Sequence, residues 1–233
     1  MQILVMNDDG YQAPGLPSGN RTARTGRNRR GCSRSRPQWL PAILSEPQEP
    51  LYVARHENGF YSVEGTPTDC VHVAITGLLE QEPDMVISGI NNGPNLGDDI
   101  IYSGTVAAAM EGRFLGLPAI AISQASFQPQ HFATAACVAV WLVNRLWQRS
   151  LPSDTILNVN VPDRPWDQLA GFQVTRLGHR HKWESRSSKV PIHVADPSTG
   201  LAQSAPNNRR ALAIDSAAVR AGYVSITPLC KSI

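Results

Sequence analysis

The sequence predicts a single α/β domain, built on a mainly parallel sheet with helices on its faces. Short apolar runs of strand type alternate along the 233 residues with segments of helical pattern, as in parallel α/β proteins. Three of the strands are followed by short polar stretches that contain glycine. Because open α/β sheets bind ligands at the carboxyl ends of their strands, these stretches mark the expected site.

The predicted elements follow one another in a regular order. The first strand covers 3–6. Thr66 and Pro67 give the start signals of a helix that continues to Leu79. A buried strand covers 84–88, and Ser103 opens a helix that runs through Glu111. The remaining elements are a strand at 118–123, a helix at about 131–148, and strands at 155–162 and 222–228.

The composition is ordinary for a soluble enzyme, with 42% hydrophobic and 17% charged residues. No apolar stretch approaches the roughly 20 residues of a transmembrane helix, and the chain opens as a strand without a basic leader region. The four cysteines have neither metal-ligand spacing nor the density of a disulfide framework. We therefore expect a cytoplasmic protein without a membrane partner.

The basic charge is confined to one segment. The net charge is +2, but seven of the 21 basic residues fall between Arg21 and Arg36, and no acidic residue occurs between Asp9 and Glu46. Such a block is typical of a nucleic-acid-binding arm. It lacks the interleaved aromatic residues of a stacking surface, so nucleic acid is not the expected partner.

Two adjacent carboxylates, Asp8 and Asp9, follow the first strand. Carboxylates are hard oxygen donors of the kind that bind Mg²⁺ or Mn²⁺, and such ions handle phosphate esters. The alternative for this pair in isolation is a solvated Asp-Asp-Gly turn.

Further polar groups follow the strand at 84–88. Asn91 offers a neutral amide ligand, and Ser103 places a hydroxyl at a helix N-terminus, where free N–H groups bind anions. A carboxylate pair for a metal, an amide ligand and a helix N-terminus together suggest phosphate ester hydrolysis. Taken singly, Asn91 is more often the cap of a turn and Ser103 the cap of its helix.

Five segments together resemble the SurE family, the stationary-phase survival proteins, which are divalent-metal-dependent 5′/3′-nucleotidases. The likeness covers 1–15 and about 51–182 almost continuously, and then about 214–229. The motifs that carry it are NDDG at 7–10 with APG at 13–15, GTPTDC at 65–70, SGINNGPNLG at 88–97, YSGTVAAAMEG at 102–112 and GYVSITPL at 222–229.

The resemblance implies a Rossmann-like three-layer core, a C-terminal arm used in oligomerisation to homodimers or homotetramers, and hydrolysis of nucleoside monophosphates. It places one divalent ion, Mg²⁺ or Mn²⁺, on Asp8, Asp9 and Asn91. Asn95 and Ser103 match positions that contact phosphate, so Asp8, Asn95 and Ser103 are the expected catalytic residues. It assigns no general acid. Tyr102 is expected to pack in the core, with stacking on a base as the alternative.

The chain departs from the family at about 16–50 and 183–213 while the spacing between flanking motifs is kept. The family has a fourth metal ligand, a serine, near position 39, where this chain has Trp39. Codons that encode 32–39 exist which, read one base later, give APDRDRSG, the missing family motif. We therefore interpret about 16–50, 183–213 and 230–233 as frameshifted, with the last helix of the family missing.

Two expectations follow for the chain as written. The Arg/Pro/Gly/Ser-rich stretch at 17–50 has no apolar period, so it should replace a helix and a core strand without burying a face. The chain would then be poorly folded or inactive. The alternatives to an active nucleotidase are a metal-binding but catalytically inactive remnant and, less favoured, a nucleic-acid-binding module.

Overall fold

The computed structural model describes residues 1–10, 13, 15, 29–33, 50–179 and 212–230. The strands are β1 Ile3–Asn7, β2 Arg29–Ser33, β3 Val53–Arg55, β4 Tyr61–Val63, β5 Met85–Asn92, β6 Ala119–Gln124, β7 Thr155–Val161, β8 Gly171–Arg176, β9 Ala213–Ile214 and β10 Tyr223–Cys230. The helices are α2 Pro67–Val73, extended by a π-helical turn Ala74–Leu78, α3 Gly104–Phe114, α4 Phe132–Gln148 and α5 Asp215–Arg220. Short 3₁₀ turns are η2 Gly97–Tyr102 and η3 Trp166–Gln168.

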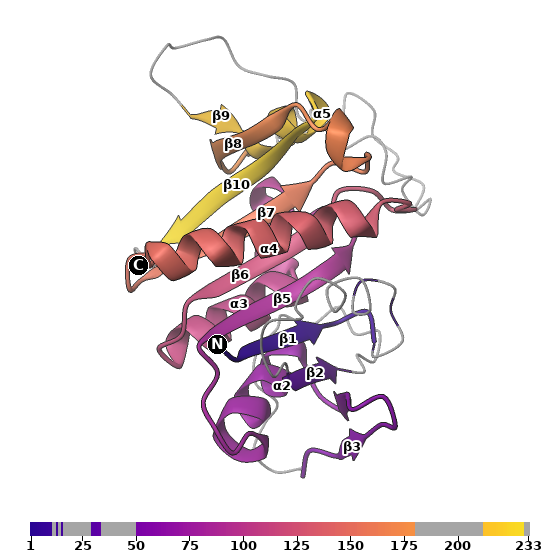
Figure 1. The fold of residues 1–233 in the computed structure, drawn as a ribbon, viewed down its shortest axis with the longest axis vertical. Coiled ribbons are helices and arrows are strands. Elements are labelled where there is room, and N and C mark those ends of the chain that lie inside the picture. The colour runs from indigo at the N-terminus through magenta and orange to yellow at the C-terminus, as the bar shows by residue number, and fades with distance from the viewer. Residues whose placement is uncertain (11–12, 14, 16–28, 34–49, 180–211, 231–233) are drawn as a thin grey trace, which may run out of the picture.

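The described strands form one sheet in the order β3-β4-β2-β1-β5-β6-β7-β10-β8-β9. The run from β4 through β2, β1, β5 and β6 to β7 is parallel, and β10 joins β7 in the antiparallel sense (Figure 1). Parallel strands end at the same edge, so the segments after β1, β5 and β6 meet there. The predicted α/β class with a mainly parallel sheet is confirmed.

Helices cover both faces of this sheet, which gives three layers. Figure 1 shows α4 crossing in front of β5 and β6, with α3 behind them. Leu142 and Val143 of α4 pack in a cluster with Ile87 and Ile120 on one face of the sheet. On the other face, α2 and α3 contribute to a second cluster with Leu4, Met6 and Val86 of β1 and β5. Because successive strand residues face opposite sides, one apolar strand supplies both clusters.

Side-chain caps fix the starts of the two helices behind the sheet. The Thr66 hydroxyl accepts a hydrogen bond from the Asp69 N–H at 3.1 Å, and the Asp69 carboxylate accepts from the Thr66 N–H at 2.7 Å. This capping box, with Pro67 in the first turn, begins α2 where the sequence predicts it. At α3, the Ser103 hydroxyl accepts from the Val106 N–H at 3.1 Å.

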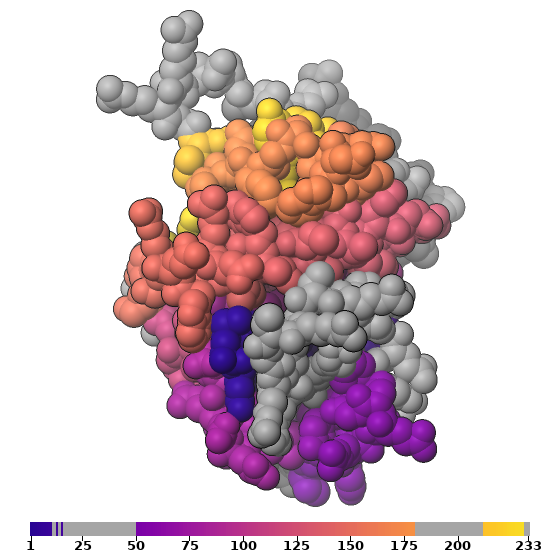
Figure 2. Space-filling model, in the orientation of Figure 1, coloured from indigo at the N-terminus to yellow at the C-terminus, as the bar shows by residue number. Residues whose placement is uncertain are grey.

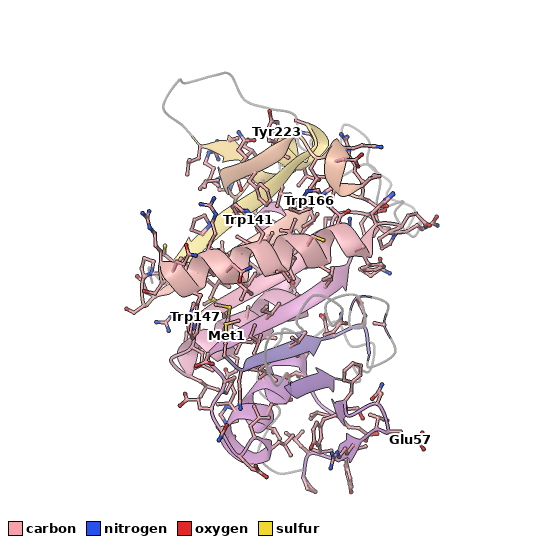
Figure 3. All side chains as sticks on the ribbon, in the orientation of Figure 1. Met1, Glu57, Trp141, Trp147, Trp166 and Tyr223 are labelled. Atoms are coloured by element: carbon pink, nitrogen blue, oxygen red, sulfur yellow. The ribbon has the colours of Figure 1, made fainter. Side chains whose placement is uncertain are left out.

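The outer face of α4 joins the C-terminal strands through aromatic side chains. Trp141 of α4 stacks on Phe172 of β8 with ring centroids 4.2 Å apart, and Trp166 meets the same ring edge-on (Figure 3). In the space-filling view, α4 and β8 form a continuous surface on this side of the molecule (Figure 2). These contacts attach β8 and β10 to the α/β core.

The expectation that the stretch at 17–50 removes a core strand is wrong at 29–33. Arg29–Ser33 forms β2, parallel to β1 on one side and to β4 on the other. Strand pairing uses main-chain N–H and C=O groups, and every residue of Arg29–Ser33 carries both, so the pairing does not require an apolar side-chain pattern. The strand prediction also omitted β3, β4, β8 and β9, each of which has six residues or fewer.

Several other predictions fall on residues outside the described part. These are the expected loss of a family helix before β2, and most of the segments at about 16–50, 183–213 and 230–233 that we interpret as frameshifted. The C-terminal arm and the absence of the last helix stay predictions. Within the described residues, no helix is long and apolar enough to cross a membrane.

Candidate active site

The acidic pair lies at the carboxyl end of β1, next to the end of β5. The Asn92 N–H, at the end of β5, donates to Asp9 Oδ2 at 2.8 Å, although 83 residues separate the two in sequence. The register of β5 against β6 shifts between Ser88 and Asn91, and pairing resumes at Asn91 and Asn92. The structure therefore brings Asp8, Asp9 and the Asn91 segment to one edge, as the sequence predicts.

Both carboxylates lie in surroundings that disfavour their charge. Burial, together with the negative charge of Asp9, raises the pKa of Asp8 to about 6, and the Thr105 hydroxyl, which donates to Asp8 Oδ1 at 2.9 Å, opposes that rise. Burial also raises the pKa of Asp9, against the opposing effect of the Asn92 N–H. A cation between the two groups would remove the cost of holding adjacent buried charges.

The start of α3 lies directly against Asp8. Thr105 stands in the first turn of α3, and a methyl group placed on Gly104 would lie 2.7 Å from Asp8 Oδ2. Only glycine leaves room for the carboxylate at this distance. The N–H groups that open the helix are thus next to the acidic pair, which is where an anion bound to a metal would need them.

Asn7 orients the site from inside the sheet. Its side chain is fully buried, donates from Nδ2 to the Ile90 carbonyl at 2.9 Å and accepts at Oδ1 from the Asp9 N–H at 2.7 Å. One amide therefore ties the β1 end to β5 and fixes the backbone of Asp9. Asn7 is not among the predicted site residues, although it belongs to the NDDG motif.

Asn91 is turned so that its carbonyl oxygen is the atom left for a cation. Its Nδ2 donates to the Gly93 carbonyl at 2.8 Å, which is the turn-capping role that the sequence offered as the alternative. The same bond sets the orientation of the amide. The capping role is therefore compatible with metal binding, and the prediction that Asn91 is a ligand stays a prediction.

Asn95 is anchored to β6 and β7. Its N–H donates to Asn160 Oδ1 at 2.8 Å, and its carbonyl accepts from Asn160 Nδ2 at 2.8 Å and from Asn158 Nδ2 at 2.9 Å. Its own Nδ2 donates to the Ser123 hydroxyl at 2.7 Å. These four bonds hold Asn95 rigidly with 9% exposure, which is the property a phosphate-contacting residue needs.

The strand residues that hold Asn95 are not among the predicted site residues. Asn158 and Asn160 are fully buried and alternate with the apolar residues Leu157, Val159 and Val161 of strand β7. Residues two apart face the same side of a sheet, so this alternation marks a polar row on one face. Ser88 and Ser123 of the neighbouring strands are fully buried in the same rows of the register. Buried amides with that spacing were the signal that could have identified the row.

Two further residues differ from their expected roles. Tyr102 is 78% exposed, so the expectation that it packs in the core is wrong. It ends the turn η2, which packs Ile100 against the apolar cluster on the α2–α3 face and leaves Tyr102 at the surface. Ser103 is buried and caps α3, which is the structural role that the sequence offered as the alternative. Its hydroxyl hydrogen remains able to donate.

The donors at the β1–β5 edge fit Mg²⁺ or Mn²⁺. They are two close carboxylates and an amide oxygen, which are hard ligands that such ions prefer. Among the described residues, no group of three or more histidine, cysteine or acidic side chains could hold a metal. The Asn91 amide is therefore needed as the third protein ligand. Trp39, at the position of the expected fourth ligand, lies outside the described part of the chain.

Fold and site together define a three-layer α/β protein with an acidic centre at the carboxyl edge of its parallel strands. The family described as survival protein SurE matches residues 3–184, and the chain belongs to this family. A 5′-nucleotidase SurE from Methylococcus capsulatus is 52% identical over 98% of this chain and 91% of its own length. A 5′-nucleotidase SurE from Nitrosococcus oceani is 51% identical with the same coverage.

A solved structure agrees with this assignment. The SurE protein from Aquifex aeolicus is 36% identical and superposes with a TM-score of 0.84 over 100% of this chain and 94% of its own. The family resemblance inferred from the five motifs is therefore confirmed.

Proposed function

We propose that this protein is a divalent-metal-dependent phosphomonoester hydrolase that acts on nucleoside 5′-monophosphates, and also on 3′-monophosphates. The observation that carries the proposal is the position of the acidic pair, held between the end of β5 and the start of α3 by Asn92 and Thr105. The names of the relatives, which are 5′-nucleotidases, support the choice of substrate class.

In this mechanism Asp8, Asp9 and Asn91 hold the ion. A divalent ion in this position supplies Lewis acidity toward the phosphate and lowers the pKa of a bound water. Ser103 and the N–H groups at the start of α3 stabilise the charge on the phosphoryl oxygens. Asn95, fixed by β6 and β7, binds another of these oxygens through its amide.

The inactive-remnant alternative predicts Mn²⁺ binding without turnover. The relatives' names give this alternative no support. It rested in part on the expected loss of a core strand, whereas strand β2 is present. Comparing phosphate release by the chain as written and by a frame-corrected chain tests it directly. The cytoplasmic location and the homodimer or homotetramer implied by the resemblance stand as proposals, to be tested by fractionation and by light scattering.

The central experiment measures phosphate release from AMP with Mn²⁺, with Mg²⁺ and after treatment with EDTA. We expect activity that depends on the metal and falls by at least about 100-fold in Asp8→Asn and Asp9→Asn, because each removes a charged metal ligand. Asp167→Asn, at an exposed aspartate in η3, is the matched control and should keep wild-type activity. Full activity in EDTA, or in Asp8→Asn, would overturn the proposal.

A further inference from the structure

The loop between β6 and α4 carries an exposed aromatic side chain beside the candidate active site. Phe127 is 59% exposed. The loop leaves β6, the neighbour of β5, at the edge where Asp8, Asp9 and Asn91 lie. A single exposed apolar residue is ordinary, so exposure by itself means nothing here. The position of Phe127 relative to Asn91 is the informative fact.

The Phe127 ring lies against the turn that orients Asn91. A methyl group placed on Gly93 would lie 3.6 Å from Phe127 Cδ1 and 4.0 Å from Asn91 Nδ2. The Gly93 carbonyl accepts the hydrogen bond from the Asn91 side chain, and the Gly93 N–H donates to the Gln124 carbonyl at 3.2 Å. Gly93 therefore lies between the Phe127 ring and the side chain of Asn91, a predicted metal ligand.

The loop that carries the ring is fixed at both ends. The Ala125 N–H donates to the Val161 carbonyl at 2.8 Å. At the other end, the Asp163 carboxylate accepts from the N–H groups of Gln130 at 3.0 Å and of His131 at 2.8 Å. An aromatic side chain on an anchored loop loses little conformational entropy when a ligand packs against it.

We propose that Phe127 binds the base of the nucleotide by stacking, with the phosphate at the acidic pair. This inference rests on the proposed function and names the residue that would recognise the nucleoside half of the substrate. Every nucleobase offers a π-face to an aromatic ring, and a phenyl ring has no polar atom with which to read base edges. The enzyme should therefore prefer purine to pyrimidine nucleotides modestly, through stacking area, and should not distinguish AMP from GMP.

A comparison of two phosphomonoesters isolates the contribution of the base to binding. AMP and ribose 5-phosphate present the same ester to the site, but only AMP has a base. We expect Phe127→Ala to raise KM for AMP by about 10-fold, as loss of one stacking contact does, with kcat and the kinetics of ribose 5-phosphate within about 2-fold of wild type. Phe127→Trp should keep or lower KM for AMP.

Three further variants serve as controls for the stacking role of Phe127. Phe127→Leu keeps an apolar contact for Gly93 but lacks the flat ring, and should behave like Phe127→Ala. Trp147→Ala removes an exposed aromatic at the opposite end of α4 (Figure 3) and should leave both substrates unchanged. Tyr102→Ala tests another exposed aromatic, which directly precedes Ser103, and it should not alter the preference for AMP over ribose 5-phosphate.

The outcomes distinguish this inference from the proposed function. If the wild type hydrolyses both substrates and Phe127→Ala affects them equally, or affects neither, the stacking role is wrong and the nucleotidase stands. If only Tyr102→Ala shifts the preference, the base lies elsewhere. Direct titration with adenosine, which has no ester to hydrolyse, gives a readout independent of turnover. Adenosine binding that weakens in Phe127→Ala supports stacking even if wild-type AMP hydrolysis fails, whereas unchanged binding contradicts it.

Discussion

The Thr105 hydroxyl donates a 2.9 Å hydrogen bond to Asp8 Oδ1 across 97 residues of sequence, and so joins the first turn of α3 to the end of β1. This bond favours the charged form of Asp8 against the burial that raises its pKa. A metal ligand must be deprotonated, so Thr105 should support metal binding without contacting the ion.

Thr105→Val removes that bond and keeps the shape of the side chain. We expect the Kd for Mn²⁺ to rise about 5-fold, the equivalent of one net hydrogen bond, while Thr105→Ser stays near wild type. Isothermal titration calorimetry measures both. Thr76→Val, at an exposed threonine whose hydroxyl donates only to the His72 carbonyl among the bonds described, is the control. Equal affinity in Thr105→Val and wild type would exclude the supporting role.

The stability of the metal-free protein should rise as the pH falls from about 7 to about 5. The pKa of Asp8 is raised in the folded state to about 6 from 3.8, so the folded chain binds more protons than the unfolded chain between these values. Protonation therefore favours folding as the pH falls, by about 1.3 kcal/mol between pH 7 and pH 5 and by at most about 3 kcal/mol below the unfolded pKa of 3.8. Urea unfolding in EDTA across the window measures it.

Asp8→Asn is the control for this pH effect. The variant cannot ionise at position 8, so its stability should change less across the same window, apart from the smaller contribution of Asp9 in the same direction. An identical pH dependence in the variant and the wild type would show that Asp8 is not the responsible group.

Asn160→Ala should destabilise the protein and impair catalysis together. It leaves the Asn95 N–H without its partner and removes one of two donors to the Asn95 carbonyl, all in a buried place. We expect a loss of about 2–3 kcal/mol and, at temperatures where the variant stays folded, a higher inhibition constant for inorganic phosphate with an unchanged Kd for Mn²⁺. Asn144→Ala, on the exposed side of α4, is the comparison. A parallel loss of metal affinity would argue for general disruption.

Thr66→Ala should cost about 1 kcal/mol by removing the cap of α2, and Thr66→Ser should restore it. The side-chain hydrogen bonds described for Thr66 go to Asp69 of its own helix, so KM for AMP should stay within about 2-fold of wild type. Urea unfolding and steady-state kinetics on the same preparations separate the two quantities. A larger change in KM for AMP, measured where Thr66→Ala is still folded, would place α2 in the site.

The elements that sequence reasoning found are those with strong local signals. The helix starts at Thr66 and Ser103 have side-chain caps, and the buried strands β1, β5, β6 and β7 are apolar runs, so both can be read from neighbouring residues. β2 and the short strands β3, β4, β8 and β9 lack such signals, because they depend on main-chain pairing with partners that are distant in sequence.

By itself, the sequence determined which chemical groups stand at the ends of the strands: the Asp8–Asp9 pair, the Asn91 amide and the Ser103 cap. Only the tertiary structure decided how they are held. Asn7 ties β1 to β5, Thr105 brings α3 to Asp8, and the amides of β7 immobilise Asn95. The strength of each of these contacts depends on distance in space and on burial, and neither quantity is encoded by separation along the chain.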